Sequence, residues 1–436
     1  MNWRAVAVVG AGYVGLPVAC TFAANGIDTL AVDVVQERVD KINRGQCPIV
    51  GDEPGLADLL SAAVGKGKLT ATTDPTRLSG AEAIIVCVDT PIDEGTKRPV
   101  LDALKGASRT VGANMRRGAL VSIESTVPPR TMSDVVIPVL EEVSGMKAGS
   151  DFRLVHCPER VMPGRLLHNL TSYDRVLGGY DQGSVDLGLS LYSTIMKGKL
   201  HPTDLLNAEL SKTLENAYRD VQIAFANEVA LACEELGADA FEVRRLVNTC
   251  PFRDMHIPGS GVGGHCLPKD PWLFASSLRG VPLRLVPAAR EINEGMPRHM
   301  VELVGSALEE KGRSVEGSRI AVLGLAFLRD SDDTRHSPSL TIIDELSGRS
   351  EVVVHDPFVA KPYRVPLVRD LGEALKGADC LVLVTDHSAY ARMDLEMVKG
   401  LMRTPAVVDG RNVLSPERCG ALGFAYRGIG KGTRKG

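Results

Sequence analysis

The chain has 436 residues, of which 44% are hydrophobic and 24% charged, and its formal net charge at pH 7 is -4. This length predicts roughly two or three domains, and the balanced composition excludes a disordered chain and a basic protein that coats nucleic acid. The nine cysteines form no Cys-x-x-Cys pair, which argues against a disulfide framework or a structural zinc site and favours a reducing cytoplasm. We find neither a signal-peptide pattern nor an apolar run of the roughly eighteen residues that span a membrane.

The first 200 residues alternate short apolar runs with helix-length segments. Such alternation predicts parallel strands whose crossover helices cover both faces of one doubly wound sheet. The expected strands are Ala5–Gly10, Thr29–Val32, Ala83–Val88, Ala119–Ile123 and Phe152–Val155, and the clearest helices are Gly15–Asn25 and Gln36–Asn43.

The middle of the chain changes character. Residues 203–236 contain no glycine or proline and carry apolar residues at helical spacing, which predicts one long helix. A Pro/Gly-rich loop follows, and then a second helix over Pro287–Leu308. Strand-like runs resume at Arg319–Leu323, Glu351–His355, Cys380–Thr385 and Ala406–Asp409.

The expected fold class is therefore α/β, with two doubly wound Rossmann-like domains joined by a long central helix. We expect residues 1–200 to form the first domain, 201–310 a central helical region and 311–436 the second domain. The tail Gly428–Gly436 is rich in Lys, Arg and Gly, and its composition predicts disorder.

A dinucleotide-binding fingerprint lies between the first strand and the first helix. The sequence Gly10-Ala-Gly12-Tyr-Val-Gly15 allows a tight turn and lets a pyrophosphate approach the amide groups at the helix start. Asp33 ends the second strand, where a carboxylate accepts from the ribose hydroxyls and repels a 2'-phosphate. This pattern predicts NAD rather than NADP as the cofactor.

Cys266 is the strongest candidate for a nucleophile. A lone cysteine is more often a small buried apolar residue, but Gly263, Gly264 and His265 precede this one and Lys269 and Asp270 follow it. Such surroundings favour an accessible thiol near a cation.

Polar residues gather at three further places. Lys212, Asn216 and Arg219 share one face of the long helix, because they are spaced by four and three residues. Glu124-Ser-Thr-Val-Pro128 and Cys157-Pro-Glu-Arg160 each follow a buried strand, where a doubly wound sheet places its ligand crevice. A solvated helix face and ordinary turn chemistry are the alternatives for these residues.

Together these segments resemble the UDP-glucose and UDP-N-acetylmannosamine dehydrogenase family, in the right order over nearly the whole chain. Arg160, after Pro-Glu, and His265, before the cysteine, resemble the branch that acts on N-acetylated sugars. The resemblance is carried by Gly10 to Pro17, Glu124 to Pro128, Cys157 to Arg160, Glu209 to Glu228, Gly261 to Cys266, Gly324 to Phe327 and Asp333 to Arg335.

The resemblance implies oxidation of the sugar C6 alcohol to a carboxylate by two NAD in turn, through a thiohemiacetal and a thioester on the cysteine. It also implies a homodimer or homotetramer built around the long helix, and a uridine diphosphate held by the carboxyl-terminal domain. We expect no metal. The implied catalytic residues are Cys266, Lys212, Asn216, Asp270, Glu159 and Thr126. The implied NAD-binding residues are Gly10, Gly12, Tyr13, Val14, Gly15, Asp33, Arg38, Thr90, Thr126 and Arg335. The implied substrate-binding residues are Glu159, Arg160, Val161, Lys212, Asn216, Arg219, Gly263, His265 and Phe327.

Three positions depart from the family pattern, and several functions stay open. Asp89 stands where a smaller or uncharged residue is usual, Arg130 where a glycine is common, and Leu328 where a lysine is usual. The favoured substrate is UDP-N-acetylmannosamine, with UDP-N-acetylglucosamine and UDP-glucose as alternatives. A two-electron dehydrogenase and a non-catalytic NAD sensor are the alternative functions of other kinds.

Overall fold

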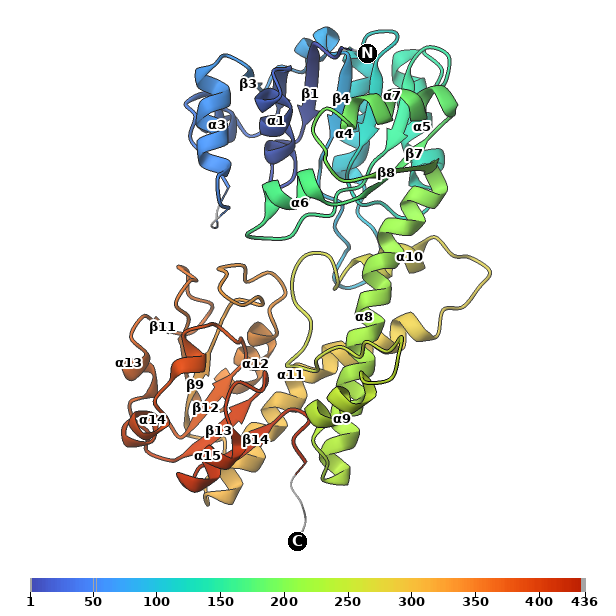
Figure 1. The fold of residues 1–436 in the computed structure, drawn as a ribbon. Helices are drawn as coiled ribbons and strands as arrows, with labels where there is room; N and C mark the ends of the chain where they lie inside the picture. The colour runs from blue at the N-terminus through green and yellow to red at the C-terminus, as the bar shows by residue number, and fades with distance from the viewer. Residues whose placement is uncertain (1, 50, 52, 433–436) are drawn as a thin grey trace. The chain divides into compact units, whose positions relative to one another are not determined.

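The structure is a computed structural model that describes residues 2–49, 51 and 53–432. Its contacts divide the chain into two units (Figure 1). Unit 1 comprises Met1–Glu215 and Trp272–Val281, and unit 2 comprises Asn216–Pro271 and Pro282–Gly436. Each unit is built around its own sheet.

Unit 1 contains an eight-stranded sheet in the order β3-β2-β1-β4-β5-β6-β7-β8. Every neighbouring pair is parallel except β6 and β7, which are antiparallel because the chain turns back through the loop and helix between them. The strands expected from the sequence, β1, β2, β4, β5 and β6, are parallel as predicted, whereas β3, β7 and β8 were not expected. The strands are β1 Ala5–Val9, β2 Asp28–Val32, β3 Leu69–Thr72, β4 Ala83–Val86, β5 Leu120–Ile123, β6 Arg153–His156, β7 Arg175–Gly179 and β8 Leu200–Asp204.

Helices cover both faces of this sheet because alternate strand residues point in opposite directions. Val6 and Val8 pack into one apolar cluster with α1, whereas Ala7 and Val9 pack into another with α4. The helices are α1 Gly15–Ala24, α2 Gln36–Asn43, α3 Leu56–Gly65, α4 Asp102–Asn114, α5 Ile137–Ser144, α6 Leu166–Ser172 and α7 Gln182–Tyr192, with a 3₁₀ turn η1 Pro75–Gly80 and a π turn η2 Met132–Val136.

The predicted long helix is α8, Leu205–Leu236. Its first turns belong to unit 1 and the remainder to unit 2. Three more helices follow: α9 Ala240–Val247, α10 Asp270–Ser276 and α11 Leu285–Glu310. The Pro/Gly-rich loop with Cys266 lies between α9 and α10.

Unit 2 contains a six-stranded, all-parallel sheet in the order β11-β10-β9-β12-β13-β14. Both sheets reverse their strand order beside the first strand, which is where a doubly wound sheet opens its ligand crevice. The strands are β9 Arg319–Leu323, β10 Glu351–His355, β11 Leu367–Val368, β12 Cys380–Leu383, β13 Ala406–Asp409 and β14 Ala425–Gly428. The remaining helices are α12 Pro338–Ser347, α13 Leu371–Leu375, α14 Leu395–Leu401 and α15 Pro416–Ala421, with a 3₁₀ turn η3 Tyr390–Arg392.

The predicted fold class, two Rossmann-like domains with a long central helix, is confirmed. The predicted disorder of the tail is wrong for residues 428–432, because Gly430 N donates to Glu234 Oε1 (2.7 Å) and Lys431 Nζ pairs with Asp239 Oδ2 (2.8 Å). Ile429 is also buried. Residues 433–436 lie outside the described residues.

Candidate functional site

The glycine-rich turn after β1 has one open position between two crowded ones. A Cβ on Gly10, whose φ is +89°, would lie 2.5 Å from the Cys87 carbonyl oxygen, and one on Gly15 would lie 1.8 Å from the Gly10 oxygen. A Cβ on Gly12 would meet nothing within 4 Å. Packing therefore explains Gly10 and Gly15, whereas Gly12 leaves the free space that a pyrophosphate needs to approach the backbone.

Asp33 lies directly against this turn. The carboxylate is buried; its Oδ2 accepts from Ala11 N (2.8 Å) and from Arg38 Nη1 (2.7 Å), and its Oδ1 accepts from Val35 N (2.9 Å). A carboxylate has about four lone-pair positions, so acceptor capacity is left for a ribose hydroxyl. The residues present thus fit a dinucleotide.

The loops that follow β4 and β5 are tied together. Ser125 Oγ accepts from Val88 N (3.0 Å) and donates to Val88 O (2.6 Å), and Thr90 Oγ1 donates to Thr126 O. Thr90 and Thr126, both expected at the cofactor, are thus neighbours in the structure. Asp89, one of the three departures, is exposed.

Arg130, the second departure, adopts the left-handed conformation with φ +72°. Glycine adopts this conformation without a steric penalty, which explains why a glycine is common here. Arg130 N donates to Glu209 Oε2 (2.8 Å) and Met132 N donates to Glu209 Oε1 (2.7 Å). Glu209, a buried residue of α8, therefore holds the loop that follows Thr126.

Glu209 provides a prediction about pH. Burial raises its pKa from 4.5 to about 7, against the lowering effect of the two backbone donors. A carboxyl whose pKa is raised on folding contributes stability at low pH that is lost as the pH rises through the folded value. We expect the free energy of unfolding of the native protein to fall by about 3 kcal/mol relative to Glu209→Gln as the pH rises from 4.5 to about 7. Chemical denaturation of both proteins across this range measures the difference, and a pH-independent difference would contradict the prediction.

A buried ion pair lies beneath the loop that carries Glu159. Arg175 Nη2 pairs with Glu124 Oε2 (3.2 Å), and Tyr192 OH donates to Glu124 Oε1 (2.7 Å). The same guanidinium donates to the carbonyl oxygens of Cys157 and Pro158. Arg175 thereby connects the end of β5 to the backbone immediately before Glu159.

Four residues expected at the substrate lie close to one another in unit 1. Glu159 Oε2 accepts from Val161 N, which folds the carboxylate back onto its own loop. Arg160 Nη2 pairs with Glu215 Oε2 (2.9 Å), and Lys212 Nζ pairs with Glu215 Oε1 (3.3 Å). Glu215 was not anticipated from the sequence, yet it links Arg160 to α8.

The loop before Cys266 is shaped by close packing on Phe327. A Cβ on Gly263 would lie 2.4 Å from the Phe327 Cβ, and one on Gly264 would lie 2.9 Å from its Cζ. Gly264 N also donates to Arg335 O (2.8 Å), while the Arg335 guanidinium pairs with Asp333 (2.6 Å). Gly263, Phe327 and Arg335, all expected at ligands, thus support the loop that carries the cysteine.

Cys266 is half-buried, and its carbonyl oxygen accepts from Lys269 N (3.1 Å) and Asp270 N (2.9 Å). Asp270 is fully buried and accepts from Asn216 Nδ2 (2.5 Å) and Lys269 Nζ (2.6 Å). Asn216 and Asp270, predicted as partners, therefore touch.

Cys20 and Cys157 are buried, whereas Cys266 is only half-buried. Burial raises the pKa of Cys20 and of Cys157 to about 12, so these thiols stay protonated near neutral pH. His265, directly before Cys266, is half-buried.

The buried polar residues of α8 differ from the predicted polar face, which comprised Lys212, Asn216 and Arg219. Arg219 is exposed, whereas Asp220 and Asn227 are buried. Asp220 Oδ1 accepts from Arg290 (2.7 Å) and Asn293 (2.8 Å), and Asn227 binds Asn293 (2.9 Å). Asn227 Oδ1 also accepts from Gly259 N (2.9 Å), so this network reaches the start of the cysteine loop.

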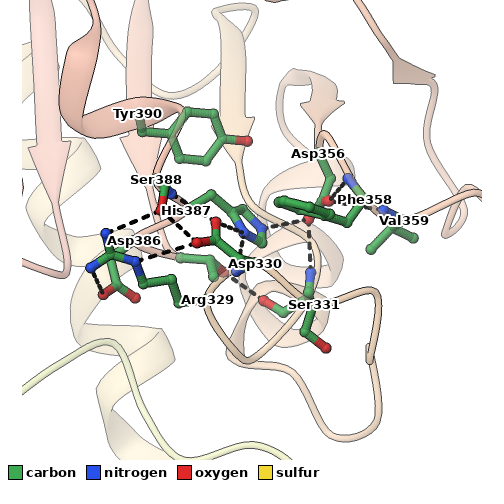
Figure 2. Close-up of polar contacts among 12 residues, drawn as sticks. Arg329, Asp330, Ser331, Asp356, Phe358, Val359, Asp386, His387, Ser388 and Tyr390 are labelled. Carbon is green, nitrogen blue, oxygen red and sulfur yellow. Dashed lines mark hydrogen bonds and ion pairs between the residues drawn. The ribbon is translucent and has the colours of Figure 1, made fainter. Parts of the chain in front are cut away.

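A second polar cluster lies at the carboxyl ends of the strands in unit 2 (Figure 2). Buried Asp356 accepts from Leu325 N (2.7 Å) and Ala326 N (3.0 Å), and also from His387 Nε2 (3.1 Å). His387 Nδ1 in turn accepts from Asp330 N (2.9 Å), so Nε2 is the ring nitrogen that donates to Asp356. This cluster fixes the loop after β9.

Leu328, the third departure, belongs to that loop and is partly exposed. The neighbouring Arg329 donates to Ser388 Oγ (3.1 Å) and lies 3.9 Å from Asp386 Oδ2 (Figure 2). Arg329 therefore supplies a cation one residue away from the position where the family usually has its lysine.

Thr126, Glu159 and Lys212 thus belong to unit 1, and Asn216, Cys266 and Asp270 to unit 2. Among the described residues, no helix is long and apolar enough to cross a membrane. Within the same part of the chain, no three His, Cys, Asp or Glu side chains gather as ligands for a metal ion.

Three models of one family match the chain in succession. The NAD-binding domain of the UDP-glucose/GDP-mannose dehydrogenase family matches residues 4–196, the central domain matches 206–295, and the UDP-binding domain matches 321–416.

Similar proteins cover nearly the full length. The chain is 40% identical over 428 residues to the UDP-N-acetyl-D-mannosamine dehydrogenase of Pyrococcus horikoshii, covering 98% of this chain and 99% of that one. The solved UDP-D-ManNAc dehydrogenase from that organism has a TM-score of 0.92, with 39% identity over 99% of this chain and 100% of that one. The NDP-N-acetyl-D-galactosaminuronic acid dehydrogenase of Methanosarcina mazei Go1 has a TM-score of 0.89, with 36% identity over 99% and 96%. The UDP-glucose dehydrogenase of Pyrobaculum islandicum has a TM-score of 0.83, with 30% identity over 94% and 95%.

These matches confirm the family resemblance and the NAD cofactor inferred from the motifs, whereas the roles of individual residues stay predictions. The chain belongs to the UDP-glucose/GDP-mannose dehydrogenase family and is an NAD-dependent dehydrogenase of nucleotide-activated sugars.

Proposed function

We propose that this dehydrogenase oxidises the C6 alcohol of UDP-N-acetylmannosamine to the uronate, through covalent intermediates on Cys266. The observation that carries the chemistry is the half-buried Cys266 on its glycine-shaped loop, followed directly by the buried Asp270–Asn216 contact. The choice of sugar rests on the relative from Pyrococcus horikoshii, which is named for UDP-N-acetyl-D-mannosamine.

The cofactor is assigned to the glycine-rich turn and to the ends of β2, β4 and β5. Gly12 leaves room for the pyrophosphate, and Asp33 keeps acceptor capacity for the ribose. Bound NAD accepts one hydride, so a four-electron oxidation uses two NAD in turn. The proposed NAD-binding residues are Gly10, Gly12, Tyr13, Val14, Gly15, Asp33, Arg38, Thr90, Thr126 and Arg335.

In the first step, a base takes the proton of the C6 hydroxyl through a water molecule held by Lys212 and Asp270, while the hydride on C6 passes to the cofactor. The Cys266 thiolate then adds to the aldehyde carbon as the carbonyl π bond breaks, and Lys212 and Asn216 stabilise the resulting oxyanion by hydrogen bonds. Loss of a second hydride from this thiohemiacetal leaves a thioester.

Hydrolysis completes the reaction. Glu159 or Asp270 takes a proton from water as its oxygen bonds to the thioester carbon, and the bond to Cys266 sulfur breaks. The uronate leaves, and the Cys266 thiolate is restored. Thr126 is assigned a place near the reacting carbon.

The substrate is assigned to the residues that the sequence motifs single out. Arg160, Arg219 and His265 offer donors that can distinguish an acetamido group from a hydroxyl. Val161, Gly263 and Phe327 are assigned to the walls around the sugar, and the UDP-binding domain to the diphosphate. In this assignment residues 1–200 bind NAD, 201–310 contribute the nucleophile and the dimer contact, and 311–436 bind UDP.

We further propose a homodimer or homotetramer that joins copies along α8, in the cytoplasm, with the uronate serving polysaccharide synthesis. Tyr218, Phe225 and Leu236 of α8 are 66%, 56% and 81% exposed. A row of exposed large apolar side chains favours burial against a second copy.

The test is the yield of NADH per mole of sugar nucleotide. Purified protein is offered limiting UDP-N-acetylmannosamine, UDP-N-acetylglucosamine, UDP-N-acetylgalactosamine or UDP-glucose with excess NAD. Two NADH from UDP-N-acetylmannosamine alone is the expected result. One NADH per sugar would contradict the four-electron mechanism, and preference for another sugar would replace the proposed substrate. UDP-N-acetylgalactosamine is included because the Methanosarcina mazei relative is named for galactosaminuronic acid.

A further inference from the structure

Glu53 touches two loops to which the cofactor and the sugar are assigned. Its Oε1 accepts from the phenol of Tyr13, in the glycine-rich turn, and from Gly164 N (2.8 Å). Its Oε2 accepts from Leu166 N (3.3 Å). Tyr13, Glu53 and Gly164 are far apart in the sequence, so the carboxylate joins three separate segments of unit 1.

The backbone of Glu53 has a firm attachment. Its carbonyl oxygen accepts from Leu56 N (3.1 Å), and Leu56 is buried at the start of α3. Leu166, at the start of α6, packs into the same apolar cluster as Leu56 and α1, and α1, α3 and α6 all belong to unit 1 (Figure 1). The carboxylate therefore projects from a fixed position toward the turn that carries Tyr13 and the loop that ends at Gly164.

Both segments lead directly to assigned ligand-binding groups. Tyr13 follows Gly12, where the turn is open for the pyrophosphate. Gly164, with φ +77°, ends the short loop that begins at Arg160 and Val161. A sugar that orders residues 160–164 also fixes the donors that face Glu53, and Glu53 in turn restrains Tyr13.

We propose that Glu53 is a positioning residue that couples sugar binding to NAD binding. The inference rests on the proposed assignment of Arg160 and Val161 to the sugar. It also meets a need of the four-electron reaction, in which spent cofactor leaves while the sugar nucleotide stays bound. Coupling between two ligands is reciprocal, so each changes the affinity of the other by the same factor.

The experiment measures this factor without turnover. NADH fluorescence gives the Kd of NADH with and without saturating UDP-N-acetylmannosamine, and the ratio of the two values is the coupling factor. NADH accepts no hydride, so the ratio is independent of whether the chain completes a four-electron oxidation. The NADH yield described above tests that oxidation separately. We expect a ratio of about fivefold or more in the native protein.

Glu53→Gln keeps the size of the side chain but replaces one acceptor oxygen by an NH₂ group that cannot accept from backbone N–H. We expect its ratio to lie within twofold of one. Tyr13→Phe removes the phenol and leaves both backbone contacts, and we expect the same loss. The double variant should lose no more than either single variant, because both break one connection. Glu142→Gln, at an exposed carboxylate, is the matched control and should keep the native ratio.

A native ratio in Glu53→Gln or in Tyr13→Phe would overturn the proposal, as would a ratio of one in the native protein. A carboxylate that only supports the fold would lower the melting temperature and weaken both ligands, yet leave the ratio unchanged. The ratio therefore separates coupling from stability.

Discussion

Cys266→Ser is expected to lower uronate formation by at least about 1000-fold. A serine hydroxyl is almost entirely protonated near neutral pH, so it traps the aldehyde and forms an ester far more slowly than a thiolate forms a thioester. The glycines beside residue 266 pack against Phe327, so the loop should keep its shape. The measurement is the rate of uronate release, together with the Kd of NADH.

The Kd of NADH should stay within about twofold of the native value, because the glycine-rich turn and Asp33 are far from residue 266 in the sequence and belong to unit 1. Cys250→Ser is the matched control, since Cys250 is an exposed cysteine of unit 2. Native rates of uronate formation in Cys266→Ser would rule out the covalent mechanism and leave the sugar assignment untouched.

Arg175→Met should be the most destabilising of the substitutions considered, at about 3–5 kcal/mol. It leaves Glu124 buried without its cation and removes donors from the carbonyl oxygens of Cys157 and Pro158. Met fills a similar volume, so the loss reports charge and hydrogen bonding more than a cavity. Thermal unfolding of the full chain, followed with and without NADH, provides the measurement.

Two further variants sharpen this prediction. Arg117→Met removes an exposed ion pair with Asp151 and should cost less than about 1 kcal/mol. Glu124→Gln combined with Arg175→Met should be less destabilised than Arg175→Met alone, because it leaves no uncompensated buried charge. A loss below about 1 kcal/mol in Arg175→Met would mean that the buried pair contributes little to the fold.

Buried strands and amphipathic helices could be predicted closely from the sequence. The predicted bounds of α2, β9, β10 and β13 agree with the structure, because each is a run whose apolar pattern matches its burial. Two strands at the edges of the sheets, β8 and β11, have no such apolar pattern in the sequence. Strand β8, Leu200–Asp204, has exposed polar residues at an edge, and β11 is only two residues long.

The residues of the candidate site also fall into those that could be predicted from the sequence and those that could not. Motifs whose chemistry is local, such as the turn from Gly10 to Gly15 and the loop before Cys266, were accessible from the sequence. Glu209, Glu215 and Asn227 were not, because each acts on a segment distant in the chain and only the tertiary fold brings the two together. Arg175 did offer a signal: an arginine that begins an apolar strand needs a buried partner.

The discontinuity of unit 1 has a consequence for how the protein is made. Residues Trp272–Val281 belong to unit 1 although the chain has left that unit at Glu215, and Leu273 within this segment is fully buried. During synthesis the amino-terminal sheet can form early, yet its last segment reaches it only after residue 281 has emerged from the ribosome. Unit 1 therefore finishes folding after the loop that carries Cys266 has already been translated, and a fragment ending at residue 200 or 215 would lack the buried Leu273.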